Sequence, residues 1–156
     1  MSTTNKVKTA IFPVGGLGTR FLPVTKSMPK EMLPVACKPI IQHAFEEAKK
    51  AGIEKFIFIT GRNKNAITNH FDHAFELESN LKEKQKTQML NQIINWLPNA
   101  GNISFIRQQK PLGLGHAIWC ARNFVNNQPF AVILADEMIL DKENYLKSMI
   151  NSFQSK

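Results

Sequence analysis

Short apolar runs recur along the chain, and each of them ends at polar or turn-forming residues. They occupy residues 8–14, 56–59, 103–106 and 130–134, and their length and composition predict four strands. The second run, Phe-Ile-Phe-Ile, is continuous, which is typical of a strand covered on both faces and therefore of a parallel sheet.

Longer segments between these runs have helical spacing. In residues 39–51 apolar side chains return every three or four positions, Pro39 suits the first turn and Gly52 suits the stop. Residues 65–78, 81–97, 113–124 and 144–153 are predicted as further helices. Strands that alternate with helices indicate an α/β fold, a mostly parallel sheet with helices on both faces.

Composition narrows the class of protein. The 156 residues fit one domain, and 43% hydrophobic with 21% charged residues is typical of a chain that buries a core. No apolar stretch approaches the roughly 20 residues that cross a bilayer, and the N-terminus is polar where a signal peptide would be apolar, so we expect a cytoplasmic protein with no membrane partner. Cys37 and Cys120 are too few for a disulfide scaffold or zinc module, which predicts reduced thiols.

The net charge of +8 is concentrated toward the N-terminus. Residues 1–64 hold eleven Lys and Arg against four Glu, and four of these cations lie on a proline-rich, irregular segment that cannot be one helix: Arg20, Lys26, Lys30 and Lys38. A polyanionic partner is one interpretation and a solvated surface is the other. A nucleic-acid-binding module is disfavoured, because the charge sits in one loop without interleaved aromatic residues.

Glycines follow the first predicted strand directly, in the run Gly15-Gly16-Leu17-Gly18-Thr19-Arg20. Their backbone N–H groups could surround an anion or a flat base without side-chain obstruction. The spacing fits neither a dinucleotide fingerprint, because Phe21 stands where a third glycine is needed, nor a P-loop. A simple tight turn explains the glycines but not the neighbouring cations, and we take Arg20 and Lys30 as the leading phosphate-binding candidates.

Two polar residues follow other strands at the ligand-binding edge of the predicted sheet. Asp136 could hold Mg²⁺ against a triphosphate, with a turn or helix cap as the alternative. Gln108 carries the donor and acceptor that reading a nucleobase requires, although a glutamine there is also ordinary loop. His70 and His73 lie three residues apart without an identified carboxylate partner, which disfavours a metal site there.

These motifs together resemble the bacterial UTP glucose-1-phosphate uridylyltransferases, or UDP-glucose pyrophosphorylases, in their N-terminal nucleotide-binding half. The resemblance covers almost the whole chain and rests on residues 12–23, 25–26, 29–34, 38–39, 107–108 and 113–117. Pro-Lys-Glu-Met-Leu-Pro (29–34), His-Phe-Asp (70–72) with Phe-Glu-Leu-Glu (75–78), and Gly-Leu-Gly-His-Ala (113–117) are the most particular to these enzymes.

The resemblance implies a Rossmann-like nucleotidyltransferase fold and the reaction of UTP with glucose 1-phosphate to give UDP-glucose and pyrophosphate. By matching position, Arg20 would stabilise the leaving pyrophosphate, Lys30 the α-phosphate, and Asp136 would hold Mg²⁺. The nucleotide-binding residues would be Gly15, Gly16, Leu17, Gly18, Gln108 and Gly113.

Three departures from the family stand out. Gly15 occupies a position that is usually alanine, and Cys37 one that is commonly aspartate. Family members are also longer, so we expect residues 1–156 to be the nucleotide-binding part, with the fold cut after the fourth strand and its following helix and the sugar-binding half absent.

The alternatives are an active uridylyltransferase and a remnant that at most binds UTP. With strand order 3-2-1-4, residues 130–134 would form an edge, which predicts self-association.

Overall fold

Four parallel strands form the centre of the computed structural model, which describes residues 6–137, 139 and 144–155. The sheet contains β1 (Thr9–Pro13), β4 (Lys55–Thr60), β5 (Ile103–Arg107) and β6 (Phe130–Val132). Its order is β5-β4-β1-β6, which is the order 3-2-1-4 considered above, and its parallel pairings confirm the predicted α/β class. The residues 1–5, to which the predicted absence of a signal peptide partly refers, lie outside the described residues.

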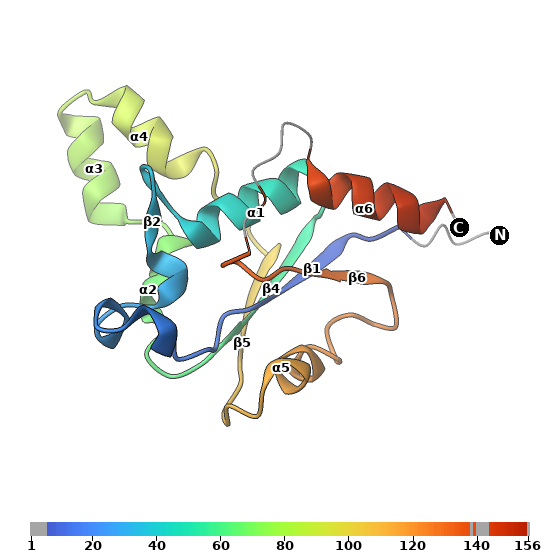
Figure 1. The fold of residues 1–156 in the computed structure, drawn as a ribbon. Coiled ribbons are helices and arrows are strands. Elements are labelled where there is room, and N and C mark those ends of the chain that lie inside the picture. The colour runs from blue at the N-terminus through green and yellow to red at the C-terminus, as the bar shows by residue number, and fades with distance from the viewer. Residues whose placement is uncertain (1–5, 138, 140–143, 156) are drawn as a thin grey trace.

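Helices cover both faces of the sheet, as predicted (Figure 1). One face packs against α1 (Ile40–Lys50), α2 (Asn65–His70) and α6 (Tyr145–Gln154), and α5 (Leu114–Cys120) covers the other face. The alternation of side chains along a strand divides the core accordingly: Phe12 and Phe58 stack at 4.7 Å on the first face, whereas Ile11 and Ile57 face α5.

The region between β4 and β5 differs from the prediction of helices over 65–78 and 81–97. It contains three helices, α2, α3 (Phe75–Glu83) and α4 (Thr87–Ile94). The first break falls where Phe71 turns into the core and Glu78 Oε1 accepts from the free N–H of Ala74 at 3.0 Å. The second falls in a run of exposed lysines, where Gln85 has a φ of 54°.

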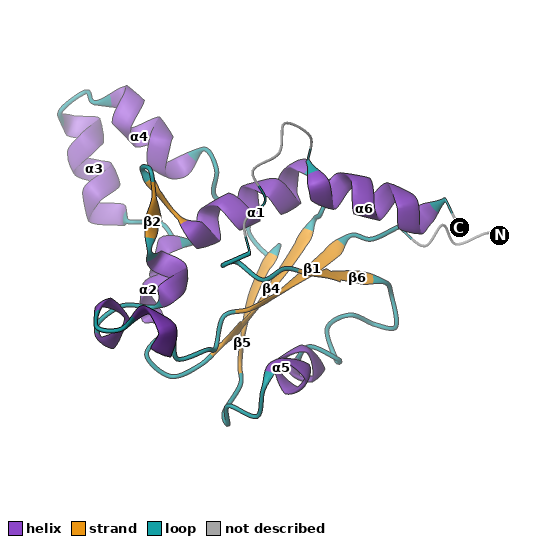
Figure 2. Cartoon of the chain, viewed as in Figure 1, coloured by secondary structure: helices purple, strands orange, loops and turns teal. Residues whose placement is uncertain are grey.

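Other predicted bounds were too long. The helix predicted over 113–124 ends at Cys120, and the strand predicted over 130–134 ends at Val132. The irregular segment after β1 is ordered into three short 3₁₀ turns, η1 (Thr19–Phe21), η2 (Val24–Lys26) and η3 (Lys30–Met32), followed by a small antiparallel pair, β2 (Pro34–Val35) and β3 (Lys38–Pro39) (Figure 2).

Within the described residues, β6 pairs with β1 alone and forms one edge of the sheet. Phe130 and Val132 are 36% and 39% exposed there. None of the helices described is long and apolar enough to span a bilayer. Cys37 and Cys120 are free thiols.

Candidate functional site

The glycine loop is fixed to the end of the neighbouring strand. Immediately after β1, the N–H of Val14 donates to Ile59 O at 2.9 Å. Gly15 then packs against Gly61, where a Cβ would lie only 2.9 Å from Gly15 O. Because that distance is shorter than real Cβ contacts allow, this close approach of two backbones requires glycine at position 61.

The loop stays open to solvent beyond this anchor. Gly18 has a φ of 68°, in the left-handed region that glycine tolerates, and its carbonyl accepts from Thr25 Oγ1 at 2.7 Å. Leu17 is 74% exposed and Arg20 is also exposed. The start of the loop is therefore anchored to β4, while its later backbone and the Arg20 side chain are exposed to solvent.

Gln108 is buried beside Gly15. It follows β5, and its backbone N–H donates to Thr60 O at 2.8 Å. Its side-chain nitrogen donates to Gly113 O at 3.1 Å and lies 3.0 Å from His116 Nδ1. Its Oε1 would be 3.1 Å from a Cβ at position 15. The structure thus brings together Gly15, Gln108 and Gly113, three of the expected nucleotide-binding residues. It adds His116, to which the sequence analysis gave no role of its own.

Lys30 and Asp136 meet at the same edge. Lys30 lies in η3 and Asp136 follows β6, yet Lys30 Nζ is 2.6 Å from Asp136 Oδ2. Partial burial alone would raise the pKa of Asp136, but the hydrogen bond and charge of Lys30, with a further contribution from Arg20, lower that pKa below its ordinary value. The two predicted cations and the predicted metal ligand therefore share one electrostatic environment.

A cavity of about 230 Å³ adjoins the glycine loop. Gly16 and Leu17 form part of its wall, together with the basic residues Lys26, Arg62 and Lys64. Gly16 also faces Lys30, whose Cε would be 3.9 Å from a Cβ at that position. Lys26 and Arg62 bring positive charge beside the glycine backbone here, which suits an anionic ligand, whereas the ammonium of Lys64 is paired with Glu31.

Asp136 fits Mg²⁺ only as part of a shared site. Among the described residues there is no group of three or more His, Cys, Asp or Glu that could hold a metal ion. Mg²⁺ commonly binds through one or two carboxylates, waters and substrate phosphates. One aspartate beside phosphate-binding cations matches that arrangement.

Glu31 and Lys64 form a buried ion pair that the sequence did not predict. Their Oε2 and Nζ atoms are 2.9 Å apart, and their side chains are only 1% and 7% exposed. The one available signal was the position of Glu31 inside the Pro-Lys-Glu-Met-Leu-Pro motif. Nothing in the sequence marked Lys64 as its partner.

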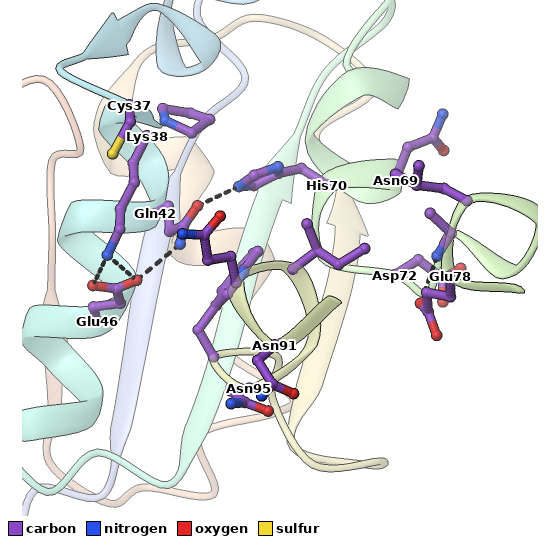
Figure 3. Close-up of a pocket in the computed structure, with 16 residues that line it drawn as sticks. Cys37, Lys38, Gln42, Glu46, Asn69, His70, Asp72, Glu78, Asn91 and Asn95 are labelled. Atoms are coloured by element: carbon purple, nitrogen blue, oxygen red, sulfur yellow. Dashed lines mark hydrogen bonds and ion pairs between the residues drawn. The ribbon is translucent and has the colours of Figure 1, made fainter. Parts of the chain in front are cut away.

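A second cavity, of about 700 Å³, lies elsewhere and is lined by residues of α1, α2, α3 and α4 (Figure 3). Gln42 is one of the residues that line it; its amide nitrogen donates to Glu46 at 2.8 Å and its oxygen lies 3.1 Å from His70 Nε2. His73 Nδ1 contacts Glu78 at 2.9 Å. The two histidines thus contact different partners, and none of the predicted site residues lines this cavity.

Comparison with known proteins identifies similar enzymes. The chain is 51% identical over 149 residues to UTP–glucose-1-phosphate uridylyltransferase of Bacillus subtilis, covering 96% of this chain and 51% of that protein. A relative from Staphylococcus saprophyticus with the same enzyme name is 49% identical, with 96% and 52% covered. The chain therefore spans about half the length of these relatives.

Solved structures give the same result. The UTP-bound UGPase from Acinetobacter baumannii superposes with a TM-score of 0.91 at 43% identity, over 96% of this chain and 53% of that one. A UDP-glucose pyrophosphorylase complexed with UDP-glucose gives a TM-score of 0.76 at 42% identity, with 95% and 53% covered. The Nucleotidyl transferase profile matches residues 9–156, and the chain accordingly belongs to the nucleotidyl transferase family.

Proposed function

We propose that the chain binds UTP at the carboxyl edge of its sheet and forms the nucleotide-binding part of a UTP–glucose-1-phosphate uridylyltransferase. The observation that carries the proposal is the meeting of Lys30 with Asp136 at 2.6 Å beside the glycine loop. A phosphate-binding cation and a magnesium-binding carboxylate must lie within one nucleotide's reach, and these two do. The enzyme names of the relatives, and the UTP-bound neighbour, support the same ligand.

In the proposed complex, the uracil lies against Gly15 and Gly16, and Gln108 and Gly113 complete its recognition. Gln108 supports this role because its amide is already held in one orientation by Gly113 O and His116. A fixed amide offers its free oxygen to a base N–H without first losing conformational freedom. The open backbone of Leu17 and Gly18 continues the wall toward the ribose and phosphates.

The proposed reaction is an in-line displacement. An oxygen of the glucose 1-phosphate phosphate forms a bond to the α-phosphorus of UTP, and the bond from that phosphorus to the oxygen bridging to the β-phosphate breaks. The electron pair leaves with pyrophosphate, and no covalent enzyme intermediate is needed. Catalysis then consists of positioning and charge compensation.

Each cation of the site has a role in this scheme. Lys30 compensates charge at the α-phosphate, and Arg20 stabilises the pyrophosphate as it leaves. Lys26 and Arg62 line the adjoining cavity, and their positive charge favours placing the terminal phosphates on that side of the glycine loop. Mg²⁺, when held by Asp136, would neutralise phosphate oxygens.

Binding and transfer are tested separately. Protein, Mg²⁺, UTP and glucose 1-phosphate are mixed and pyrophosphate release is followed, while UTP binding is measured by calorimetry. Binding with release supports the whole proposal. Binding without release limits it to a nucleotide-binding unit, the alternative in which UTP is bound but not transferred. Absence of UTP binding by folded protein contradicts it.

A further inference from the structure

We propose that the buried Glu31–Lys64 ion pair positions Lys30 for the α-phosphate, so that Glu31 and Lys64 are positioning residues of the nucleotide site. This inference rests on the proposed UTP site. Among the described residues, the side chains of Glu31 and Lys64 form a hydrogen bond with each other. They form none with Asp136, Gln108 or Gly113, so any effect on the nucleotide would be indirect.

Burial of this pair is hard to explain by stability alone. Lys64 Nζ donates to Glu31 Oε2 at 2.9 Å, but the second carboxylate oxygen, Oε1, is buried without a hydrogen-bond partner among the described residues. Removing two charges from water costs free energy that one contact of this kind returns incompletely, and apolar side chains of similar volume often stabilise as well or better. The pair is therefore better explained by a need to fix the position of the turn that carries Lys30.

The pair connects the phosphate-binding turn to the scaffold. Glu31 follows Lys30 within the single turn η3, which packs against α1 and α2. Fixing the Glu31 carboxylate therefore restricts where the Lys30 side chain begins. Lys30 must reach both Asp136 and a phosphate, and its ammonium lies 2.6 Å from the carboxylate.

Lys64 belongs to residues 61–64, which we call the brace because they contact the glycine loop at both of its ends. Gly61 packs on the backbone of Gly15 at the start of the loop, and Lys64 holds Glu31 near its end. Gly61 O in turn accepts from the Arg107 guanidinium at 3.0 Å. The segment 61–64, which follows β4, thus contacts the chain at both ends of the stretch from Gly15 to Glu31.

Paired replacement separates positioning from stability. In Glu31→Met/Lys64→Met, both charges are removed together, so no isolated buried charge is left and the melting temperature is expected to stay near that of the unaltered protein. UTP affinity in the presence of Mg²⁺ is expected to fall on the order of tenfold, a typical effect of residues that act without touching the ligand. The matched control, Lys38→Met/Glu46→Met, removes an ion pair of 2.8 Å elsewhere and should leave UTP affinity unchanged.

A double-mutant cycle tests whether the ion pair acts on UTP binding through Lys30. Adding Glu31→Met/Lys64→Met to Lys30→Met should cause no further loss of UTP affinity, because the group being positioned is already gone. A full additional loss in that background, unchanged affinity of the paired variant, or a gain in affinity for Glu31→Gln through release of Lys64 would each overturn the inference.

Glu31→Asp covers the case in which the paired variant does not fold. It keeps the charge but shortens the arm by one methylene, so it should weaken UTP binding while the protein still melts cooperatively. Unchanged affinity in Glu31→Asp would overturn the inference. If the unaltered, folded protein itself fails to bind UTP, the proposed function fails and this inference with it, and the two failures are distinguished by that first titration.

Discussion

The ammonium of Lys30 lies 2.6 Å from Oδ2 of Asp136, although the two residues are 106 positions apart in the chain. The candidate phosphate-binding cation and the candidate metal ligand are thus each other's partners. A divalent cation that approaches Asp136 must displace the Lys30 ammonium or share the carboxylate with it.

Lys30→Met should therefore tighten the binding of Mg²⁺ to the protein alone. The carboxylate then has no competing cation, and an effect of about fivefold or more is expected for a coupled pair of this kind. Titration with Mg²⁺, or with Mn²⁺ as a spectroscopic probe, measures it. Lys38→Met, which removes a cation paired with Glu46, is the control. Equal or weaker Mg²⁺ binding by Lys30→Met would show that the two cations do not compete.

The same pair predicts a pH dependence. Since the pKa of Asp136 is lowered in the folded protein, the stabilisation from this carboxylate is complete above its unfolded value of about 3.9 and is lost as the pH falls through the lower folded value. The difference in unfolding free energy between the unaltered protein and Asp136→Asn should be constant from pH 7 to about 4 and shrink below that. Denaturant unfolding at a series of pH values checks this. A difference that vanishes between pH 7 and 5 would be inconsistent with the lowered pKa.

The contact between Gly15 and Gly61 predicts a sharp effect of one methyl group. Gly61→Ala places a Cβ 2.9 Å from Gly15 O, and the backbone shift it forces should cost about 1–3 kcal/mol of stability. Gly115→Ala is the control, since nothing lies within 4 Å of its Cβ and the residue is in α5, where alanine is the better helix former. Thermal melts of the two variants should move in opposite directions. Equal melting temperatures would exclude the close approach.

His70 predicts a second pH effect, away from the nucleotide site. Its burial lowers its pKa, so the unfolded chain binds a proton there more readily and stability decreases as the pH falls below about 6.5. Its Nε2 lies 3.1 Å from Gln42 Oε1, which fits a neutral ring that donates from that atom (Figure 3). His70→Gln should reduce the slope of stability against pH between 7 and 5.5. A slope identical to that of the unaltered protein would contradict the burial effect.

Much of the sheet could be predicted because apolar runs report burial directly. The run Phe56 to Ile59 is buried on both faces in β4, since strands on both sides and helices on both faces exclude water from it. The edge positions of Gly15, Gln108 and Asp136 followed from the same pattern, because parallel strands end together. These parts depend on local spacing, which a single sequence contains.

The helix breaks and the buried ion pair could not be predicted, because they depend on contacts between segments that are distant in the sequence. The break at Phe71 depends on which side chain enters a core built by distant strands. Glu31 and Lys64 look like ordinary surface residues until the fold encloses them, at 1% and 7% exposure. Only the packing of η3 against α2, from segments 33 residues apart, makes them partners.

The central claim is that Arg20, Lys30 and Asp136 hold UTP beside the glycine loop. Calorimetric titration of UTP with Mg²⁺ into the folded chain, beside Lys30→Met and the control Lys38→Met, tests it most directly. We predict saturable binding to the unaltered protein and the control, and affinity lower by at least about tenfold in Lys30→Met, the scale of a lost charge-assisted contact. Heat that stays flat for the unaltered protein, or equal affinity in Lys30→Met, would contradict it.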